Sequence, residues 1–568
     1  MKLIGLFALL GVLVAFPLAA GGGQGNASRG AVANSAAIVN RPGQLPIVTQ
    51  PTTFTLGLRQ SPHVENYDTN KLTLWLEKQT GIKTNFHIFS TVAADSNTQF
   101  ELMVSAGEKL PDIMLFAPGD WMLHGDNGVF VDLNPYFKDW AYFYNERVNG
   151  PNVPASEKLR IEMKSTAPSG KRYAYSMYSQ QANMPYQGMN FINQKWLRAL
   201  GLQMPKTTED FYNVLVAFRD RNPAGTGVAT IPWVGAFMTG GNPLEFVINA
   251  FVYHPYRDHG NFYLNATNGK LWTPWTTEEY RDALRYLNRL YSEGLLHAST
   301  FTNTQPELAA IVTYQPNETG RVGFFSGNMT QVLLPETPGV FDFTFQQPLT
   351  GPKGVSYYPM IPHRIVPSSF ITKDCAYPEA AFRWLDYFSD KDACLISRQG
   401  EKDIDWRWLT PAELALPTAK TYFGSPAVIQ QINVTWATMG NKHWNIEPAQ
   451  MYVEHETTVM TRWTDDGSFA ANRYKMYQTY VERVGPNRDV PEKVENILYT
   501  AAELNQIREI RTSIDTYREE SRALFITGQL SLDRDWANYL ATLNRMGLQR
   551  YLDVAQAAYT RTLGVLKK

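Results

Sequence analysis

An excess of charge of either sign is the first thing that the sequence lacks. Its 568 residues include 52 Lys and Arg against 53 Asp and Glu, a formal net charge of -1. Nucleic-acid-binding proteins usually carry a clear basic excess, so this balance argues against a nucleic-acid partner. The length allows about two to four domains and a large hydrophobic core.

Cysteine is scarce as well. Cys375 and Cys394 are the only two in the chain. An exported protein could join them in a disulfide, but sequence spacing does not supply the geometry that a bridge requires. Two buried free thiols in neighbouring helices are the competing interpretation, and the sequence leaves both open.

The short motifs of common enzyme classes are also missing. His455 and Glu456 would begin a zinc-protease motif, but Val459 stands where the second histidine is required. There is no G-x-S-x-G, and the glycine-rich run at 21–25 follows no predicted strand. We therefore expect no catalytic residue, metal or cofactor. A carboxylate pair suited to glycoside hydrolysis stays open, because its spacing cannot be read from sequence.

Long hydrophobic runs are absent except at the start of the chain. Lys2 precedes an apolar run from Leu3 to Phe16, and small residues lead to Ala20. This pattern predicts a secretory signal over residues 1–20, and the apolar run is shorter than a membrane-spanning helix requires. Residues 21–50 are rich in Gly, Ala, Asn and Pro, which predicts a flexible tether.

The same leader resembles a bacterial lipoprotein signal, but it lacks the residue that accepts the lipid. Gly21 stands where that signal places its cysteine. Without a thiol the thioether cannot form. We therefore expect a protein that is exported to the periplasm, cell surface or extracellular space and is not lipid-anchored.

Aromatic residues, by contrast, are abundant at 13% of the chain, with 14 Trp and 30 Tyr. Aromatic faces stack on the C–H faces of sugar rings, so a carbohydrate ligand is one interpretation. A large, well-packed core is the other, because abundance alone does not locate a site.

Strands and helices alternate in the first part of the chain, and more helices follow. Three strands are expected at 52–58, 84–89 and 112–116, and helices at 71–80, 98–106, 277–293, 377–389, 500–526 and 532–563. The alternation predicts a mostly parallel α/β sheet. Ligands bind at the carboxyl ends of such strands, which favours the loop Ala117 to Trp121 as part of a site.

The segment Gly170 to Phe218 adds a possible hinge. It predicts a strand, a polar aromatic crossover rich in amides and tyrosines, a second strand and two helices. Thr207 and Asp210 predict a capping box at the start of the second helix. A strand pair carrying polar aromatics between two compact halves suggests a hinge beside a ligand.

Several segments, in this order, resemble the extracytoplasmic solute-binding proteins of ABC importers, in their large oligosaccharide-binding branch. Besides the hinge segment they are KLTLWLEKQTGIKTNFHIF, QFELMVSAGEKLPDIML, GRVGFFSGNM, AAFRWLDYFSDKDACLISRQG and FITGQLSLDRDWANYLATLNRMGLQRYLDVAQAAYTR. The resemblance implies a type II periplasmic-binding-protein fold, in which two α/β lobes clamp the ligand and extra helices follow at the C-terminus. Hinge closure would present a joined surface to a membrane permease.

The resemblance also implies lobe boundaries. The chain would first cross between lobes near 184–188 and return near 358–363. Lobe one would hold residues 51–184 and 363–425, and lobe two residues 185–362 and 426–568. A monomer is expected.

The sequence departs from these relatives at two further places. RNPAGTGVATIP, residues 221–232, has no carboxylate where relatives carry an Asp-rich calcium loop, so we expect no calcium there. Gly327, Asn328 and Met329 stand where relatives often place a Trp.

Twelve residues are candidate ligand contacts, each with a structural alternative. The resemblance favours Asp120 and Trp121, which could instead cap backbone and cover the sheet. The competing interpretations are surface solvation for Arg59, hinge packing for Tyr186 and Gln187, core burial for Trp233, and helix capping for His363 and Arg364. In a strand the last two residues of the set would share one face, with Arg407 on the other. The set is Arg59, Phe116, Asp120, Trp121, Tyr186, Gln187, Trp233, Asn328, His363, Arg364, Trp406 and Trp408.

The function expected from these observations and from the resemblance is reversible capture of a saccharide, expected to be an oligosaccharide, for an ABC importer. Two alternatives stay open: a secreted carbohydrate-active enzyme, and a binding protein that reports to a sensor kinase. The sequence does not name the sugar.

Overall fold

The computed structural model describes residues 38–566 apart from 152, 180–189, 226, 237–242, 256–262, 315–319, 328–331, 333–338, 359–363, 420–426, 434, 436–439, 447–450, 453–474, 476–478, 480–481, 483–493 and 495–496.

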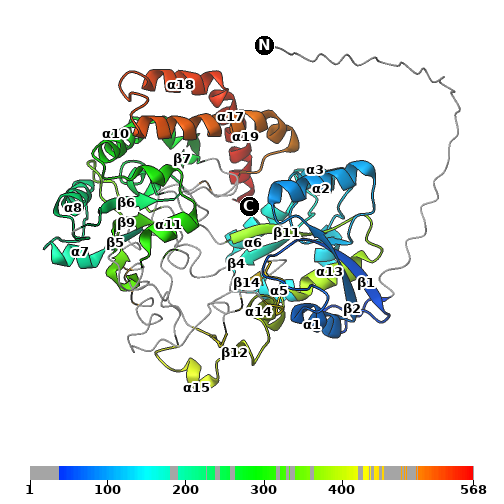
Figure 1. Ribbon diagram of the computed structural model, residues 1–568. Helices are drawn as coiled ribbons and strands as arrows, with labels where there is room; N and C mark the ends of the chain where they lie inside the picture. Colours follow the sequence, from blue (N-terminus) through cyan, green and yellow to red (C-terminus); the bar gives the residue numbers. More distant parts are fainter. Residues whose placement is uncertain are drawn as a thin grey trace, which may run out of the picture.

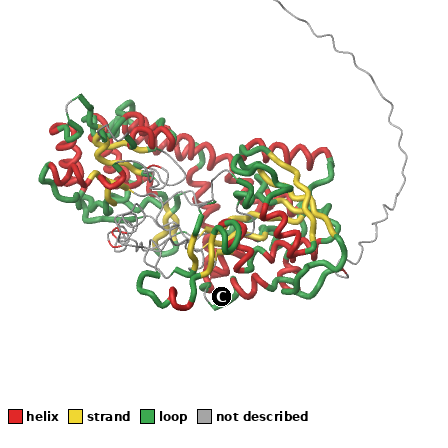
Figure 2. Tube along the Cα trace, turned by 60° about the horizontal axis from the view of Figure 1, so that its bottom comes forward, coloured by secondary structure: helices red, strands yellow, loops and turns green. Residues whose placement is uncertain are grey.

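The described chain forms two α/β lobes, each built on its own sheet (Figure 1). Lobe one has a six-stranded sheet in the order β14-β4-β11-β3-β1-β2, and lobe two has a four-stranded sheet in the order β10-β5-β9-β6. In Figure 2 one group of strands lies at the left and another at the right, with short strands between them and helices around both groups. The two-lobe α/β architecture expected from the sequence is confirmed.

Lobe one contains β1 (Thr52–Arg59), α1 (Lys71–Thr80), β2 (Ile82–Phe89), α2 (Ala93–Ala106), β3 (Ile113–Met114), α3 (Trp121–Asp126), α4 (Asn134–Asp139), α5 (Phe143–Arg147), α6 (Ala155–Ser165), β4 (Tyr175–Ser179), β11 (Arg364–Ile371), α13 (Pro378–Tyr387), α14 (Lys391–Gln399), β12 (Trp406–Trp408), α15 (Pro411–Leu414), β13 (Ile429–Gln431) and β14 (Met451–Tyr452).

Lobe two contains β5 (Asn190–Asn193), α7 (Gln194–Ala199), α8 (Thr208–Arg221), β6 (Ile231–Gly235), α9 (Glu245–Ile248), β7 (Asn265–Thr267), β8 (Lys270–Trp272), α10 (Glu278–Ser292), α11 (Gln305–Val312), β9 (Val322–Ser326), β10 (Phe343–Phe345), α17 (Ala501–Ile526), α18 (Trp536–Arg545) and α19 (Leu548–Leu566), with short 3-10 turns at Pro274–Thr276, Ala298–Phe301 and Val340–Asp342.

Strand direction in lobe one positions the candidate site. β1 runs parallel to β2 along its whole length, from Thr52 opposite Ile82 to Arg59 opposite Phe89, and parallel to β3. The carboxyl ends of these three strands therefore meet at one edge of the sheet. β11, which enters from lobe two, runs antiparallel to both β3 and β4, so the sheet is mixed rather than parallel throughout.

Lobe two repeats this mixed pattern. β6 pairs with β9 in parallel, whereas β5 is antiparallel to β9 and β10. The predicted capping box at the start of α8 is confirmed: the Thr207 hydroxyl accepts from the Asp210 N–H, and the Asp210 carboxylate accepts from the Thr207 N–H. This side-chain pair fixes where the helix begins.

The C-terminal helices cover lobe two (Figure 1). α17 packs against α10 and α19, and Phe525, Tyr539 and Tyr551 are buried in the same apolar cluster as Trp233 of β6. The helix expected over 532–563 is two helices, because Gly547 between them has a φ of 98°. A residue in this left-handed conformation ends α18 and turns the chain into α19.

The predicted tether is wrong for residues 38–50. The guanidinium of Arg383, on α13, donates hydrogen bonds to the carbonyls of Asn40, Arg41 and Gln44 at 2.6–2.8 Å. Ile47 is fully buried in the core of lobe one. An apolar residue and a buried cation hold this part of the N-terminal segment against the lobe.

The predicted lobe boundary at 425/426 lies too early. β13 pairs with β12, β14 extends the lobe-one sheet beside β4, and the Trp444 indole donates to Thr73 at 2.8 Å. The described residues from β13 to β14 therefore pack on lobe one. β4 ends at Ser179 and β5 begins at Asn190, so the first lobe connection, predicted at 184–188, lies outside the described residues. The predicted return at 358–363 also lies there, except for Tyr358.

Both cysteines are free and buried, which decides between the two interpretations left open. Burial raises the pKa of the Cys375 thiol to about 12, so it stays protonated at neutral pH. Within the described part of the chain, no helix is long and apolar enough to span a lipid bilayer.

Candidate ligand-binding site

Five side chains gather where β1, β2 and β3 end, and we refer to them as the strand-end cluster. Arg59 is the last residue of β1, Phe116 follows β3, and Asp120 precedes α3. Ser96 and Asn97 lie near the start of α2, which follows β2. Parallel strands bring these chain-distant residues to one edge of the sheet, where α/β proteins bind ligands.

Arg59 is the organising residue of the strand-end cluster. Its Nε donates to Ser96 Oγ at 2.7 Å and its Nη2 to Asn97 Oδ1 at 3.3 Å. The guanidinium lies over the Phe116 ring, 4.5 Å from the centroid. Burial lowers the Arg59 pKa, but an arginine remains cationic at neutral pH. The cation is thus held in place with N–H donors to spare.

Asp120 faces the other lobe. It makes no capping bond to α3; instead its two oxygens accept from the Nη1 and Nη2 of Arg508 at 2.9 and 3.0 Å. Arg508 lies on α17 of lobe two, so this bidentate pair joins the lobes. Both side chains are about half exposed, which leaves the carboxylate accessible to a competing hydrogen-bond donor.

Phe116 of the strand-end cluster and the neighbouring Trp121 are packed into the core of lobe one. Trp121 is 8% exposed and its ring lies 5.4 Å from that of Phe370 on β11. Phe116 is also buried and packs edge-on against Phe89. Trp121 covers the sheet, the structural alternative to ligand contact.

Two further predicted contacts are core residues, which corrects the expectation for them. Trp233 is fully buried, with its ring 5.6 Å from those of Phe211 and Phe324. Trp406 is fully buried too, and its indole donates to the Gly400 carbonyl at 3.0 Å. Large aromatic side chains contribute most to stability when buried, and sequence alone does not tell such a residue from an exposed platform.

Trp408 is partly exposed to solvent. Its ring lies 5.6 Å from that of Trp406, so the prediction that these residues share one face of a strand is confirmed. Arg407 pairs with Glu413 at 2.8 Å. The Trp408 indole donates to Asp392 Oδ1 at 2.8 Å, which fixes its orientation.

Most of the remaining predicted contacts lie outside the described residues. Tyr186, Gln187, Asn328 and His363 are in this group. Arg364 is described: it begins β11, opposite Ser179 at the end of β4, and is half-buried.

Sequence reasoning missed Ser96, Asn97 and Arg508. The first two lie in the opening turns of α2, which begins at Ala93 rather than at the expected residue 98. A search for polar residues just after each strand would have found them. Arg508 had no such signal, because its partner lies 388 positions away along the chain.

The segment that lacks carboxylates, residues 221–232, is shaped by an amide instead. Asn222 adopts a left-handed conformation after α8, its Nδ2 donates to the Gly225 carbonyl at 2.7 Å, and its Oδ1 accepts from Thr230 at 2.6 Å. Among the residues that the structure describes, no cluster of His, Cys, Asp or Glu could hold a metal ion.

The family model for bacterial extracellular solute-binding proteins matches residues 65–393. The chain belongs to this family. Among its relatives is the fructooligosaccharide ABC transporter substrate-binding protein FusA of Streptococcus pneumoniae, 22% identical over 513 residues that cover 85% of each chain. Lipoprotein LipO of Bacillus subtilis is 30% identical over 231 residues, 39% of this chain and 40% of LipO.

Solved structures show that this solute-binding protein shares its fold with similar proteins. FusA in complex with kestose has a TM-score of 0.70 at 20% identity, covering 90% of this chain and all of FusA. An extracellular solute-binding protein from Bifidobacterium longum subsp. infantis has a TM-score of 0.71 at 18% identity, covering 90% and 98%. The arrangement of two lobes is therefore that of the family.

Proposed function

We propose that this solute-binding protein captures an oligosaccharide between its lobes and delivers it to an ABC importer. The observation that carries the proposal is the strand-end cluster, in which Arg59 is held in place by Ser96 and the accessible carboxylate of Asp120 pairs with Arg508 of lobe two. The saccharide-binding relative FusA, aligned over most of both chains, supports the choice of ligand.

Each group has a role suited to a neutral polyhydroxy ligand. Asp120 accepts hydrogen bonds from sugar hydroxyls in place of Arg508, and Arg59 donates to ring or hydroxyl oxygens. Trp408, which is partly exposed, remains a proposed ring contact. The other proposed contacts remain Tyr186, Gln187, Asn328, His363 and Arg364.

Capture of this kind requires no covalent chemistry. A few hydrogen bonds and ring contacts typically give micromolar affinity, about -8 kcal/mol, which still permits release. Closure of the lobes around the sugar would create the surface that permease subunits bind. We further propose that the protein acts as a monomer. We also propose that it carries no lipid at residue 21, because Gly21 offers no thiol.

The test is calorimetric titration of the purified protein with kestose, maltotetraose, cellotetraose and mannotetraose. We expect at least one sugar to bind with micromolar affinity and to be recovered unchanged after prolonged incubation. Asp120→Asn should weaken that binding about tenfold or more, because a hydrogen bond to a charged group is worth about 1.5–3 kcal/mol.

The matched control is Asp533→Asn. Asp533 is an exposed carboxylate of lobe two that pairs with Arg285 at 2.9 Å, so its loss should leave sugar affinity unchanged. Tight binding of a peptide or metal with no response to any saccharide would refute the sugar assignment. Turnover of a bound glycan would instead identify an enzyme.

A further inference from the structure

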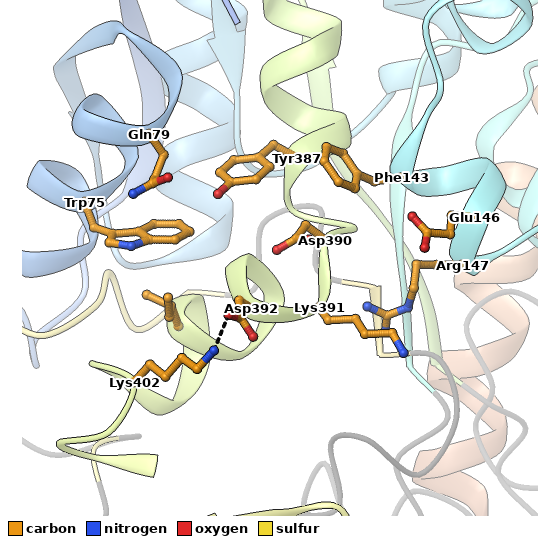
Figure 3. A pocket seen from close by; sticks show the side chains of 11 residues that line it. Trp75, Gln79, Phe143, Glu146, Arg147, Tyr387, Asp390, Lys391, Asp392 and Lys402 are labelled. Atoms are coloured by element: carbon orange, nitrogen blue, oxygen red, sulfur yellow. Dashed lines mark hydrogen bonds and ion pairs between the residues drawn. The ribbon is translucent and has the colours of Figure 1, made fainter. Parts of the chain in front are cut away.

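Lobe one contains a cavity that the strand-end cluster does not line. It has a volume of about 410 Å³ and lies between α1, α5 and the turn from α13 to α14 (Figure 3). Small-molecule sites typically enclose about 300–1,000 Å³, so the cavity is large enough to hold a compact ligand.

One wall of this cavity is aromatic. Trp75 and Tyr387 stack nearly parallel, with ring centroids 5.7 Å apart and an interplanar angle of 11°. Phe143 continues the row, 5.6 Å from Tyr387. The three rings lie side by side along the upper part of the view in Figure 3. They come from α1, α13 and α5, so three separate elements support the wall.

The opposite wall is charged but balanced. Lys402 and Asp392 form an ion pair at 2.6 Å, and Arg147 donates to the Ser389 carbonyl at 3.2 Å. The carboxylates and the cations among the lining residues are equal in number; they are Glu146, Asp390, Asp392, Arg147, Lys391 and Lys402. This balance favours a neutral ligand over an ion.

Two polar groups at the aromatic side have no hydrogen-bond partner within the described chain: the Gln79 amide and the Tyr387 hydroxyl. Both face the cavity in Figure 3. Burial and the nearby carboxylates of Asp390 and Asp392 raise the pKa of Tyr387, so the hydroxyl remains a donor at neutral pH. A polar ligand would satisfy both groups.

We propose that this cavity is a second saccharide site. The apolar C–H face of a sugar ring can stack on the row of Trp75, Tyr387 and Phe143. The sugar hydroxyls can form hydrogen bonds with Gln79 and with the Lys402–Asp392 pair. The inference rests on the proposed function for its class of ligand, but it concerns a different part of the lobe. The occupant is either a distal unit of the sugar held between the lobes or a separate glycan molecule.

Hydrogen exchange and titration with the same four sugars test the site. We expect bound sugar to slow exchange in residues 71–80 and 387–402. The double variant Gln79→Leu/Tyr387→Phe keeps the ring row and removes both free polar groups. It should abolish this protection and weaken cavity binding about tenfold or more. A second binding step in the wild type indicates a separate glycan, whereas a single step that weakens in the variant indicates one long ligand.

The control is Gln549→Leu/Tyr291→Phe, the same changes on α19 and α10 of lobe two, which should leave protection and affinity as in the wild type. Melting temperatures establish that both variants fold. The second site is overturned if sugar binds without slowing hydrogen exchange in the cavity segments. It is also overturned if the wild type and the cavity variant bind sugar equally well. Either result leaves the proposed function intact. If none of the four sugars binds, both proposals fail.

Discussion

His443 is buried in lobe one and accepts a hydrogen bond at Nδ1 from the Asn445 N–H at 3.0 Å. Only a neutral imidazole can accept this bond. Burial, with a smaller contribution from the Arg398 charge, lowers the His443 pKa from 6.5 to about 4. One residue thus makes the stability of the lobe depend on pH.

The sign follows from proton counts. Between pH 6.5 and 4 the unfolded chain holds more protons on His443 than the folded chain, so stability is full above pH 6.5 and falls on acidification. Through this group, acidification from pH 7 to pH 5 should lower the free energy of unfolding by about 2 kcal/mol. His443→Asn keeps an acceptor without titrating, so we expect its free energy of unfolding in urea to change less over that range, by about the same amount.

His87→Asn serves as the control, because His87 is exposed on β2. This variant should retain the wild-type pH dependence. An identical pH dependence in His443→Asn and the wild type would contradict the role assigned to His443.

Local features at this scale could be read from sequence, and burial could not. The Thr207–Asp210 capping box involves residues three apart, so the local pattern determines it. Trp233 and Trp408 look alike in sequence, but the first is enclosed by α8 and β9 and the second keeps exposed surface. What covers a tryptophan depends on distant segments.

At the scale of elements, the alternation of strands and helices was predictable because apolar periodicity reports each element separately. The boundaries that failed depend on pairing between distant segments. β14 has two residues and joins the sheet only by lying beside β4. The hairpin-like segment at 38–50 is held by Arg383, more than 300 positions away in the chain.

The contact of α17 with lobe one gives a prediction at this scale. Exposed ion pairs contribute about 0.2–1 kcal/mol, so removing the Arg508–Asp120 pair should shift the equilibrium between lobe arrangements by at most about fivefold. Fluorophores attached at Lys83→Cys in lobe one and Lys270→Cys in lobe two would report the distance between the lobes by energy transfer. Compared with the wild type, Arg508→Gln should show a larger population with widely separated lobes. The native cysteines are buried, so they should label slowly.

Salt gives an independent check on the same pair. Sodium chloride at about 0.5 M should screen the charges and move the wild type toward the variant, with little further effect on the variant itself. Arg545→Gln, on α18, is the matched control and should behave as the wild type. No change in energy transfer on either treatment would show that packing alone sets the lobe arrangement.

At the scale of the whole molecule, the N-terminal segment is part of lobe one. A chain that starts at residue 51 leaves the buried Arg383 without its three carbonyl partners and exposes the site that Ile47 fills. Compared with a chain that starts at residue 38, it should lose about 3 kcal/mol or more in free energy of unfolding, as is usual when a buried charge loses its partners.

A double-mutant comparison isolates the cause of this loss. In the shortened chain, Arg383→Met removes the unpaired charge and should restore part of the stability, whereas in the longer chain the same change should be destabilising. Additive effects in the two backgrounds would mean that Arg383 does not hold the segment.

The six-stranded sheet of lobe one draws its strands from residue 52 to residue 452. Many contacts in this sheet therefore join residues far apart in the chain. Lobe one cannot assemble its core until most of the chain is present. Chains dominated by such long-range pairings fold slowly. We predict that such a delay would let an exported chain stay extended while it crosses a membrane and become compact only after translocation is complete.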